Sequence, residues 1–108
     1  MNDQCNPTYG KVDDVLEMLT KSKSLHLLMV LDRSSGPLRF TQLKEQVSAS
    51  STTVSRRLKE LEANGLIVRS MNPAMPQSNL YSLSSDGEKL SPVMQSLYDW
   101  AEHWTLPS

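Results

Sequence analysis

The sequence predicts a mainly α-helical fold that carries one small β-hairpin (α+β). Residues 40–47 have apolar side chains at every third or fourth position, the spacing of one helix face. A three-residue break separates them from a second amphipathic segment, 51–64, which ends before Gly65. Two short apolar segments with a turn-rich stretch between them follow and predict the hairpin. This order of elements is that of a winged helix-turn-helix.

The elements before this motif are an arm and two helices. Residues 1–10 are polar and contain Pro and Gly, so we expect a flexible arm. Apolar side chains at steps of three and four predict an amphipathic helix over 12–19. Residues 25–31 are apolar on nearly all sides, which predicts a central helix. Residues 34–37 end it, and 38–40 are suited to a short strand.

The elements after Gly65 are the hairpin and a last helix. Residues 66–69 and 80–83 predict its two strands, and a turn-rich wing covers about 70–79. Residues 84–87 lead into one terminal helix, whose apolar stripe recurs at steps of three and four. The stripe consists of Leu90, Val93, Met94, Leu97, Ala101 and Trp104.

Length and composition fit one winged-helix domain over residues 11–106. A chain of 108 residues has room for one core, and with 38% apolar residues a monomer is expected to be marginal, which favours an oligomer. No apolar run reaches about 18 residues and the polar start is no signal peptide. The single cysteine, Cys5, excludes an internal disulfide network, so we expect a cytoplasmic protein.

No enzyme class finds support in the sequence. There is no glycine-rich phosphate loop, and no nucleophile stands at a known spacing from a base. Asp99, Glu102 and His103 are the one grouping at metal-ligand spacing, and we interpret them as the solvated face of a helix. We therefore expect no catalysis, no metal and no cofactor.

Charge is distributed unevenly along the chain. The net charge is only −1, but residues 38–59 hold five cations against one carboxylate, a local sum of +4. Residues 1–20 and 84–108 each sum to −3. A basic middle between acidic ends suits a protein that binds phosphate with one surface only.

The polar side of 51–64 is the candidate DNA-binding surface, because it offers only hydroxyls and cations. Arg56 is the candidate for direct readout, since a guanidinium pairs bidentately with guanine; the alternative is a side chain that is solvated or forms an ion pair with Glu60. Ser50 is placed to cap this helix, with a base contact as the alternative. The predicted DNA contacts are Arg39, Thr41, Ser51, Thr52, Thr53, Ser55, Arg56, Arg57, Lys59, Arg69 and Gln77.

The wing is expected to lie near the minor groove. No Lys or Arg occurs between Ser70 and Ser78, so the wing should contribute shape and a few polar contacts. An ordinary hairpin loop is the alternative.

The chain resembles a known family along most of its length. The stretch GPLRFTQL from Gly36, the stretch VSRRLKELEANGLIVR from Val54, and the residues around Tyr81, Gly87 and Pro92 are similar to HxlR-type winged-helix transcriptional regulators, which are related to MarR-like regulators. The resemblance spans about residues 11–104. It implies a homodimeric, cytoplasmic, DNA-binding regulator whose terminal helices form the dimer interface.

Two departures from the family pattern stand out. Members usually carry a Trp ahead of the second helix, where this chain has Lys21–Ser24. The Cys-Pro found near the N-terminus of members is Cys5-Asn6-Pro7 here.

The terminal helices supply the residues predicted for the dimer interface. Their apolar stripes are expected to be shared between the subunit core and the partner subunit. The predicted interface residues are Val12, Leu16, Leu19, Leu97, Trp100, Ala101 and Trp104.

Cys5 has two interpretations. The resemblance includes regulators in which an N-terminal cysteine senses oxidants or electrophiles, and an exposed arm would leave the thiol accessible. Lys11 is the only nearby cation, so nothing evident activates the thiol, and an incidental cysteine is the alternative. A redox or small-molecule effector thus stays open.

The sequence as a whole predicts a sequence-specific transcriptional regulator that binds double-stranded DNA as a homodimer. The alternative is a winged-helix module that binds proteins without direct DNA readout. The Arg56, Arg57 and Lys59 cluster favours DNA.

Overall fold

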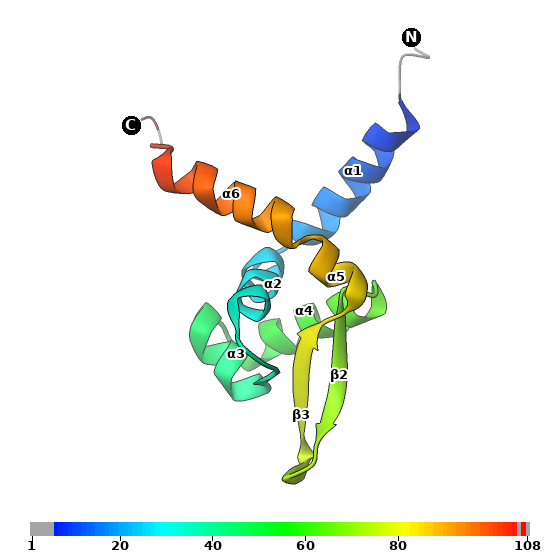
Figure 1. Ribbon diagram of the computed structural model, residues 1–108, viewed down its shortest axis with the longest axis vertical. Coiled ribbons are helices and arrows are strands. Elements are labelled where there is room, and N and C mark those ends of the chain that lie inside the picture. The colour runs from blue at the N-terminus through cyan, green and yellow to red at the C-terminus, as the bar shows by residue number, and fades with distance from the viewer. Residues whose placement is uncertain (1–5, 106, 108) are drawn as a thin grey trace.

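The computed structural model describes residues 6–105 and 107, without the side chains of residues 76 and 77. Over these residues, six helices accompany a small antiparallel sheet (Figure 1). The elements are α1 (Pro7–Leu19), α2 (Ser24–Arg33), β1 (Leu38–Arg39), α3 (Phe40–Val47), α4 (Ser51–Ala63), β2 (Ile67–Asn72), β3 (Met75–Leu83), α5 (Ser85–Lys89) and α6 (Ser91–His103). The predicted winged helix-turn-helix is confirmed.

The sheet has three strands in the order β1-β3-β2. Leu38 of β1 pairs with Tyr81 of β3, and Ile67 of β2 pairs with Leu83. The register shifts between Met71 and Asn72, near the tip of the hairpin. The sheet thereby anchors the start of α3 and projects the β2–β3 wing away from the helices (Figure 1).

The hydrophobic core lies around α2, as its continuous apolar sequence predicts. Leu27 and Leu28 of this helix are fully buried. The face of α4 that points inward closes the core, and α3 and β2, with Leu19 of α1 and Met94 of α6, complete it. Its other fully buried apolar side chains are Leu43, Val47, Val54, Leu61 and Ile67.

The terminal helices project from one end of the molecule and the wing from the other (Figure 1). The longest dimension is 56 Å, against 25 Å for the shortest. α1 and α6 diverge from each other, so much of their surface lies free of the core. None of the described helices is both long and apolar enough to cross a bilayer.

α1 begins earlier than the sequence pattern indicates. The Asn6 side chain accepts a hydrogen bond from the Thr8 N–H at 2.8 Å, and Pro7 occupies the first turn. Both are favourable at a helix start, because a side-chain oxygen satisfies a free N–H and proline lacks one. The expected irregular arm is therefore helical from Pro7 on.

The C-terminal segment is two helices, where one was predicted. α5 ends and α6 begins at Leu90. Pro92 lies in the first turn of α6, where its missing N–H is tolerated, whereas inside one continuous helix it would break the hydrogen bonding. The strands of the hairpin are also longer than predicted, so only Pro73 and Ala74 separate β2 from β3.

Gly87 of α5 lies very close to the backbone of Leu66, so a substitution there tests how tightly the two segments pack. A Cβ atom there would overlap the carbonyl oxygen of Leu66. We expect Gly87→Ala to lower the free energy of unfolding by about 1–3 kcal/mol, because backbone must move. Gly10→Ala, with nothing within 4 Å of the added atom, should instead raise it by up to about 1 kcal/mol. Urea unfolding at one protein concentration measures both, and equal effects would contradict the packing argument.

Candidate nucleic-acid interface

The turn between α3 and α4 sets the position of the candidate reading helix. Ser48 ends α3 in the left-handed conformation, with φ 53°. The Ser50 hydroxyl then accepts a hydrogen bond from the Thr53 N–H at 3.2 Å and caps α4. Gly65, at φ 77°, follows the other end of α4 in the left-handed region that glycine favours. The predicted cap and stop are confirmed.

The two sides of α4 differ completely in chemistry. Val54, Leu58 and Leu61 are buried in the core. The opposite side forms one edge of a shallow, open depression next to Phe40 of α3. We call its polar residues the recognition face: Ser51, Thr52, Ser55, Arg56 and Lys59. The structure thus brings together five of the predicted DNA contacts, and it holds Thr52, Arg56 and Lys59 exposed.

Arg56 is free for a ligand within the described part of the chain. No carboxylate of these residues lies within 4 Å of its guanidinium, and the predicted alternative partner, Glu60, is occupied elsewhere. Glu60 accepts a hydrogen bond from Arg57 at 2.6 Å and lies 3.8 Å from the Lys21 ammonium. No ion pair within 4 Å joins Arg56 to Glu60 in the described residues, so of the two alternatives for Arg56 only a solvated side chain stays open.

Arg57 is separated from the recognition face, although the sequence placed it among the phosphate contacts. Its Nε donates a hydrogen bond to the backbone oxygen of Ser22 at 3.0 Å, and its side chain is only 14% exposed. Together with Glu60 it ties α4 to the connection between α1 and α2. Arg57 is thus placed to hold the helix in position, and its contact with phosphate stays a prediction.

This ion pair lowers the pKa of Glu60 below its ordinary value, chiefly through the hydrogen bond from Arg57. The contribution to stability is present above the unfolded-state pKa and is lost as the pH falls through the folded-state pKa. We expect Glu60→Gln to lower the free energy of unfolding at neutral pH. At a pH below the usual pKa range of a glutamate, the substitution should leave this free energy unchanged. Urea unfolding across this pH range measures it. Glu45→Gln, which removes an exposed carboxylate of α3, is the control, and a pH-independent effect of Glu60→Gln would refute the assignment.

The remaining predicted DNA contacts lie outside the recognition face. Arg39 and Thr41 are exposed next to the start of α3. Thr53 lies at the cap, where its hydroxyl accepts a hydrogen bond from Ser50 at 3.1 Å. Arg69, on β2, has its Nε 3.6 Å from a Glu62 oxygen, so part of its charge is compensated. The Gln77 side chain and Cys5 lie outside the described residues.

The residues predicted for the dimer interface form an exposed apolar surface, with one exception. We call this surface the terminal apolar face; the ring of Trp100 on α6 stacks on that of Trp104, directly after the end of α6, with centroids 5.0 Å apart. Leu19 is the exception, because it is 8% exposed and packs in the core of the subunit; its place in the interface stays a prediction. The face consists of the exposed side chains Tyr9, Val12, Val15, Leu16, Val93, Leu97, Trp100, Ala101 and Trp104.

Three members of the terminal apolar face were not among the predicted residues. Val15 and Val93 belong to the amphipathic stripes, so helical periodicity was a signal that could have identified them. Tyr9 lies in the segment expected to be irregular, and only the early start of α1 brings it into line with Val12 and Leu16.

The comparisons with known proteins agree with this geometry. The HxlR-like helix-turn-helix family matches residues 18–108. The chain is 33% identical over 103 residues to the uncharacterized HTH-type transcriptional regulator YvaP of Bacillus subtilis, covering 94% of this chain and 91% of YvaP. It is 33% identical over 106 residues to the HTH-type transcriptional regulator YodB of the same organism, covering 94% and 90% of the two chains.

Solved structures show the same fold. The reduced form of YodB from B. subtilis is similar with a TM-score of 0.74 and 29% identity, over 91% of this chain and 95% of that one. A mutant of S. aureus MepR bound to an oligodeoxyribonucleotide has a TM-score of 0.68 and 26% identity, over 87% of this chain and 70% of that one.

Proposed function

This chain belongs to the HxlR-like helix-turn-helix family of transcriptional regulators, and we propose that it binds a specific DNA site as a homodimer. In this proposal α4 lies in the major groove and the wing, residues 70–79, lies near the minor groove. The observation that carries the proposal is the recognition face, which stands open on α4 while the opposite side of the helix is buried. The similar MepR structure bound to an oligodeoxyribonucleotide supports it.

In this proposal some residues of the recognition face contact bases and others contact the DNA backbone. Among the described residues no carboxylate pairs with Arg56, so its guanidinium is available for bidentate contact with a guanine edge. Lys59 lies one turn further along and suits a phosphate, which positions the helix without reading sequence. The hydroxyls of Ser51, Thr52 and Ser55 accept or donate at either kind of site. Arg39 and Thr41 extend the contact to neighbouring phosphates.

The dimer rests on the terminal apolar face. Tryptophan side chains exposed on one helix of a monomer are costly in water, and a second copy related by a two-fold axis would cover both faces at once. Since α1 and α6 project away from the wing, such a dimer leaves both recognition faces open (Figure 1). A two-fold dimer of this kind binds a near-palindromic site with half-sites about one helical turn apart.

The direct test is selection of bound sequences from a random duplex pool with the purified protein. We expect an inverted repeat whose half-sites each contain a guanine and are separated by about 10 base pairs. Enrichment of no sequence, or of a single unrepeated site, would overturn the proposal.

Lys59 allows a quantitative check of the phosphate contact. For the selected duplex, affinity should fall steeply with salt, because each neutralised phosphate releases counterions and adds about 0.9 to the slope of log affinity against log salt. Lys59→Gln should reduce this slope by about 2 per dimer and weaken all sequences equally. Lys89→Gln removes the same charge from α5 and should leave the slope unchanged. An unchanged slope for Lys59→Gln would exclude the phosphate contact.

A further inference from the structure

The end of the wing is an exposed apolar surface that carries no charge. Met71 is 66% exposed and Met75 is 52% exposed, and Pro73 and Ala74 between them are exposed as well. We call these four residues the wing tip. None of the residues from 70 to 79 is charged. A surface of this kind is stabilised by apolar contacts and gains nothing from the charge of a phosphate.

The turn that presents the wing tip is held in one shape. The Asn72 side-chain oxygen accepts a hydrogen bond from the Ala74 N–H at 3.0 Å, and the ring of Pro73 fixes its φ. Little conformational entropy is therefore lost when a ligand orders the turn. The four side chains of the wing tip contain no hydrogen-bonding group except the methionine sulfurs, which are weak acceptors.

The wing is long enough for its tip to reach the groove next to the one that α4 would occupy. It points away from α1 and α6 and extends beyond α3 and α4 (Figure 1). β2 has six residues and begins at Ile67 in the core, so at about 3.3 Å per residue it carries the tip roughly 20 Å outward. Half a helical turn of DNA, the step from a major groove to the adjacent minor groove, is about 17 Å.

The minor groove distinguishes base pairs mainly by one amino group. A·T and T·A pairs present only acceptors there, whereas a G·C pair adds the N2 amino group of guanine, which is a donor. The unbranched side chain of methionine is slender enough for a groove about 6 Å wide, where it packs against the C–H groups of the sugars. Covering a guanine amino group with such a side chain removes its water without supplying a good acceptor, which is unfavourable.

We propose that the wing tip lies in the minor groove and selects A·T or T·A pairs there, because Met71 and Met75 exclude the guanine amino group. This inference rests on the proposed function, since it requires α4 to lie in the neighbouring major groove. It adds a second, apolar reading of sequence that uses no cation of the wing.

Inosine separates this reading from recognition in the major groove. An I·C pair presents the same groups as G·C in the major groove but lacks the amino group in the minor groove. Each position that flanks the guanine contacts of the selected duplex is made A·T, G·C and I·C in turn, and fluorescence anisotropy measures the affinity. At the position under each wing, G·C should weaken binding at least about fivefold, the effect of one buried donor left unsatisfied, and I·C should restore it. Equal affinity for G·C and I·C at every flanking position, in a duplex that Arg56 still reads, would overturn this inference and leave the proposed function standing.

The double variant Met71→Ser/Met75→Ser assigns the effect to the wing tip. It should abolish the difference between G·C and I·C and leave the salt dependence of binding unchanged, because no phosphate contact is lost. Both residues are exposed, so urea unfolding should match that of the wild type. Val68→Ser is the matched control, since Val68 is 46% exposed on β2 but lies near the base of the wing, and it should keep the difference. A difference that persists in the double variant would refute the assignment.

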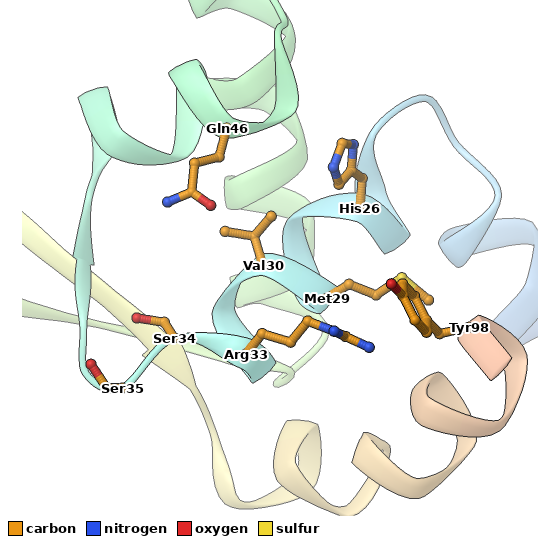
Figure 2. A pocket seen from close by; sticks show the side chains of 8 residues that line it. All are labelled: His26, Met29, Val30, Arg33, Ser34, Ser35, Gln46 and Tyr98. Atoms are coloured by element: carbon orange, nitrogen blue, oxygen red, sulfur yellow. The ribbon is translucent and has the colours of Figure 1, made fainter. Parts of the chain in front are cut away.

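The methionine methyl signals give an independent NMR measurement on the complex with the selected duplex. The methyl groups of Met71 and Met75 should show nuclear Overhauser contacts to the sugar H1′ and adenine H2 protons, which line the minor groove. Met29, which borders the cavity between α2, α3 and α6 together with Tyr98, is the reference and should show none (Figure 2). Contacts to major-groove protons alone, or no contact of either wing methionine with DNA, would contradict the inference.

Discussion

Trp100→Asp is expected to convert the proposed homodimer into a monomer at micromolar concentration. Trp100 is 58% exposed in the subunit and stacks on Trp104, so its ring belongs to the surface that a partner would cover. Loss of a buried aromatic ring costs about 2 kcal/mol per chain. A two-fold interface contains this ring from both chains, so the dimer loses about twice this free energy. The dimer dissociation constant should therefore rise about a thousandfold.

Sedimentation velocity at several concentrations measures this change. Met71→Asp is the matched control, because Met71 is 66% exposed but lies on the wing, away from the terminal apolar face. It should leave the dimer intact. A wild-type protein that sediments as a monomer at micromolar concentration, or a Trp100→Asp variant that stays dimeric, would exclude the interface.

Arg56→Gln is expected to have the largest effect on sequence recognition. A bidentate contact between arginine and guanine contributes about 1–3 kcal/mol, and the dimer makes it once in each half-site. Affinity for the selected duplex should fall at least about thirtyfold. Affinity for unrelated duplex should fall much less, because the phosphate contacts remain. Preference for guanine at one position of each half-site should disappear.

Fluorescence anisotropy with the selected duplex and with duplexes changed at single positions measures both effects. Lys89→Gln serves as the charge-matched control on α5, and it should keep the full preference. If Arg56→Gln weakened all duplexes equally, Arg56 would be a phosphate contact and the base would be read by another residue.

The helix-turn-helix was predictable because its determinants are local. The periodicity of α4 separates Val54 and Leu58 from Thr52 and Lys59 by helix geometry alone. The Ser50 cap and the stop at Gly65 also depend on neighbours within four residues. These elements therefore agree with the structure almost residue by residue.

The surroundings of a residue could not be predicted where they depend on a partner far along the chain. Arg57 has a cationic side chain on the flank of α4, and nothing local reveals that its Nε meets the Ser22 oxygen 35 positions earlier. Leu19 continues the stripe of α1, but that stripe runs from the exposed part of the helix into the core. A single amphipathic pattern cannot tell which of its residues face the subunit and which face a partner.

Chemical methylation interference on the selected duplex tests most directly whether the recognition face lies in the major groove. Dimethyl sulfate methylates guanine at N7 in the major groove and adenine at N3 in the minor groove. The account predicts that N7 methylation of one guanine in each half-site blocks binding of the wild-type protein, because it occupies the atom that Arg56 contacts. Binding that is blocked by adenine N3 methylation alone, and is indifferent to every guanine N7, would contradict it.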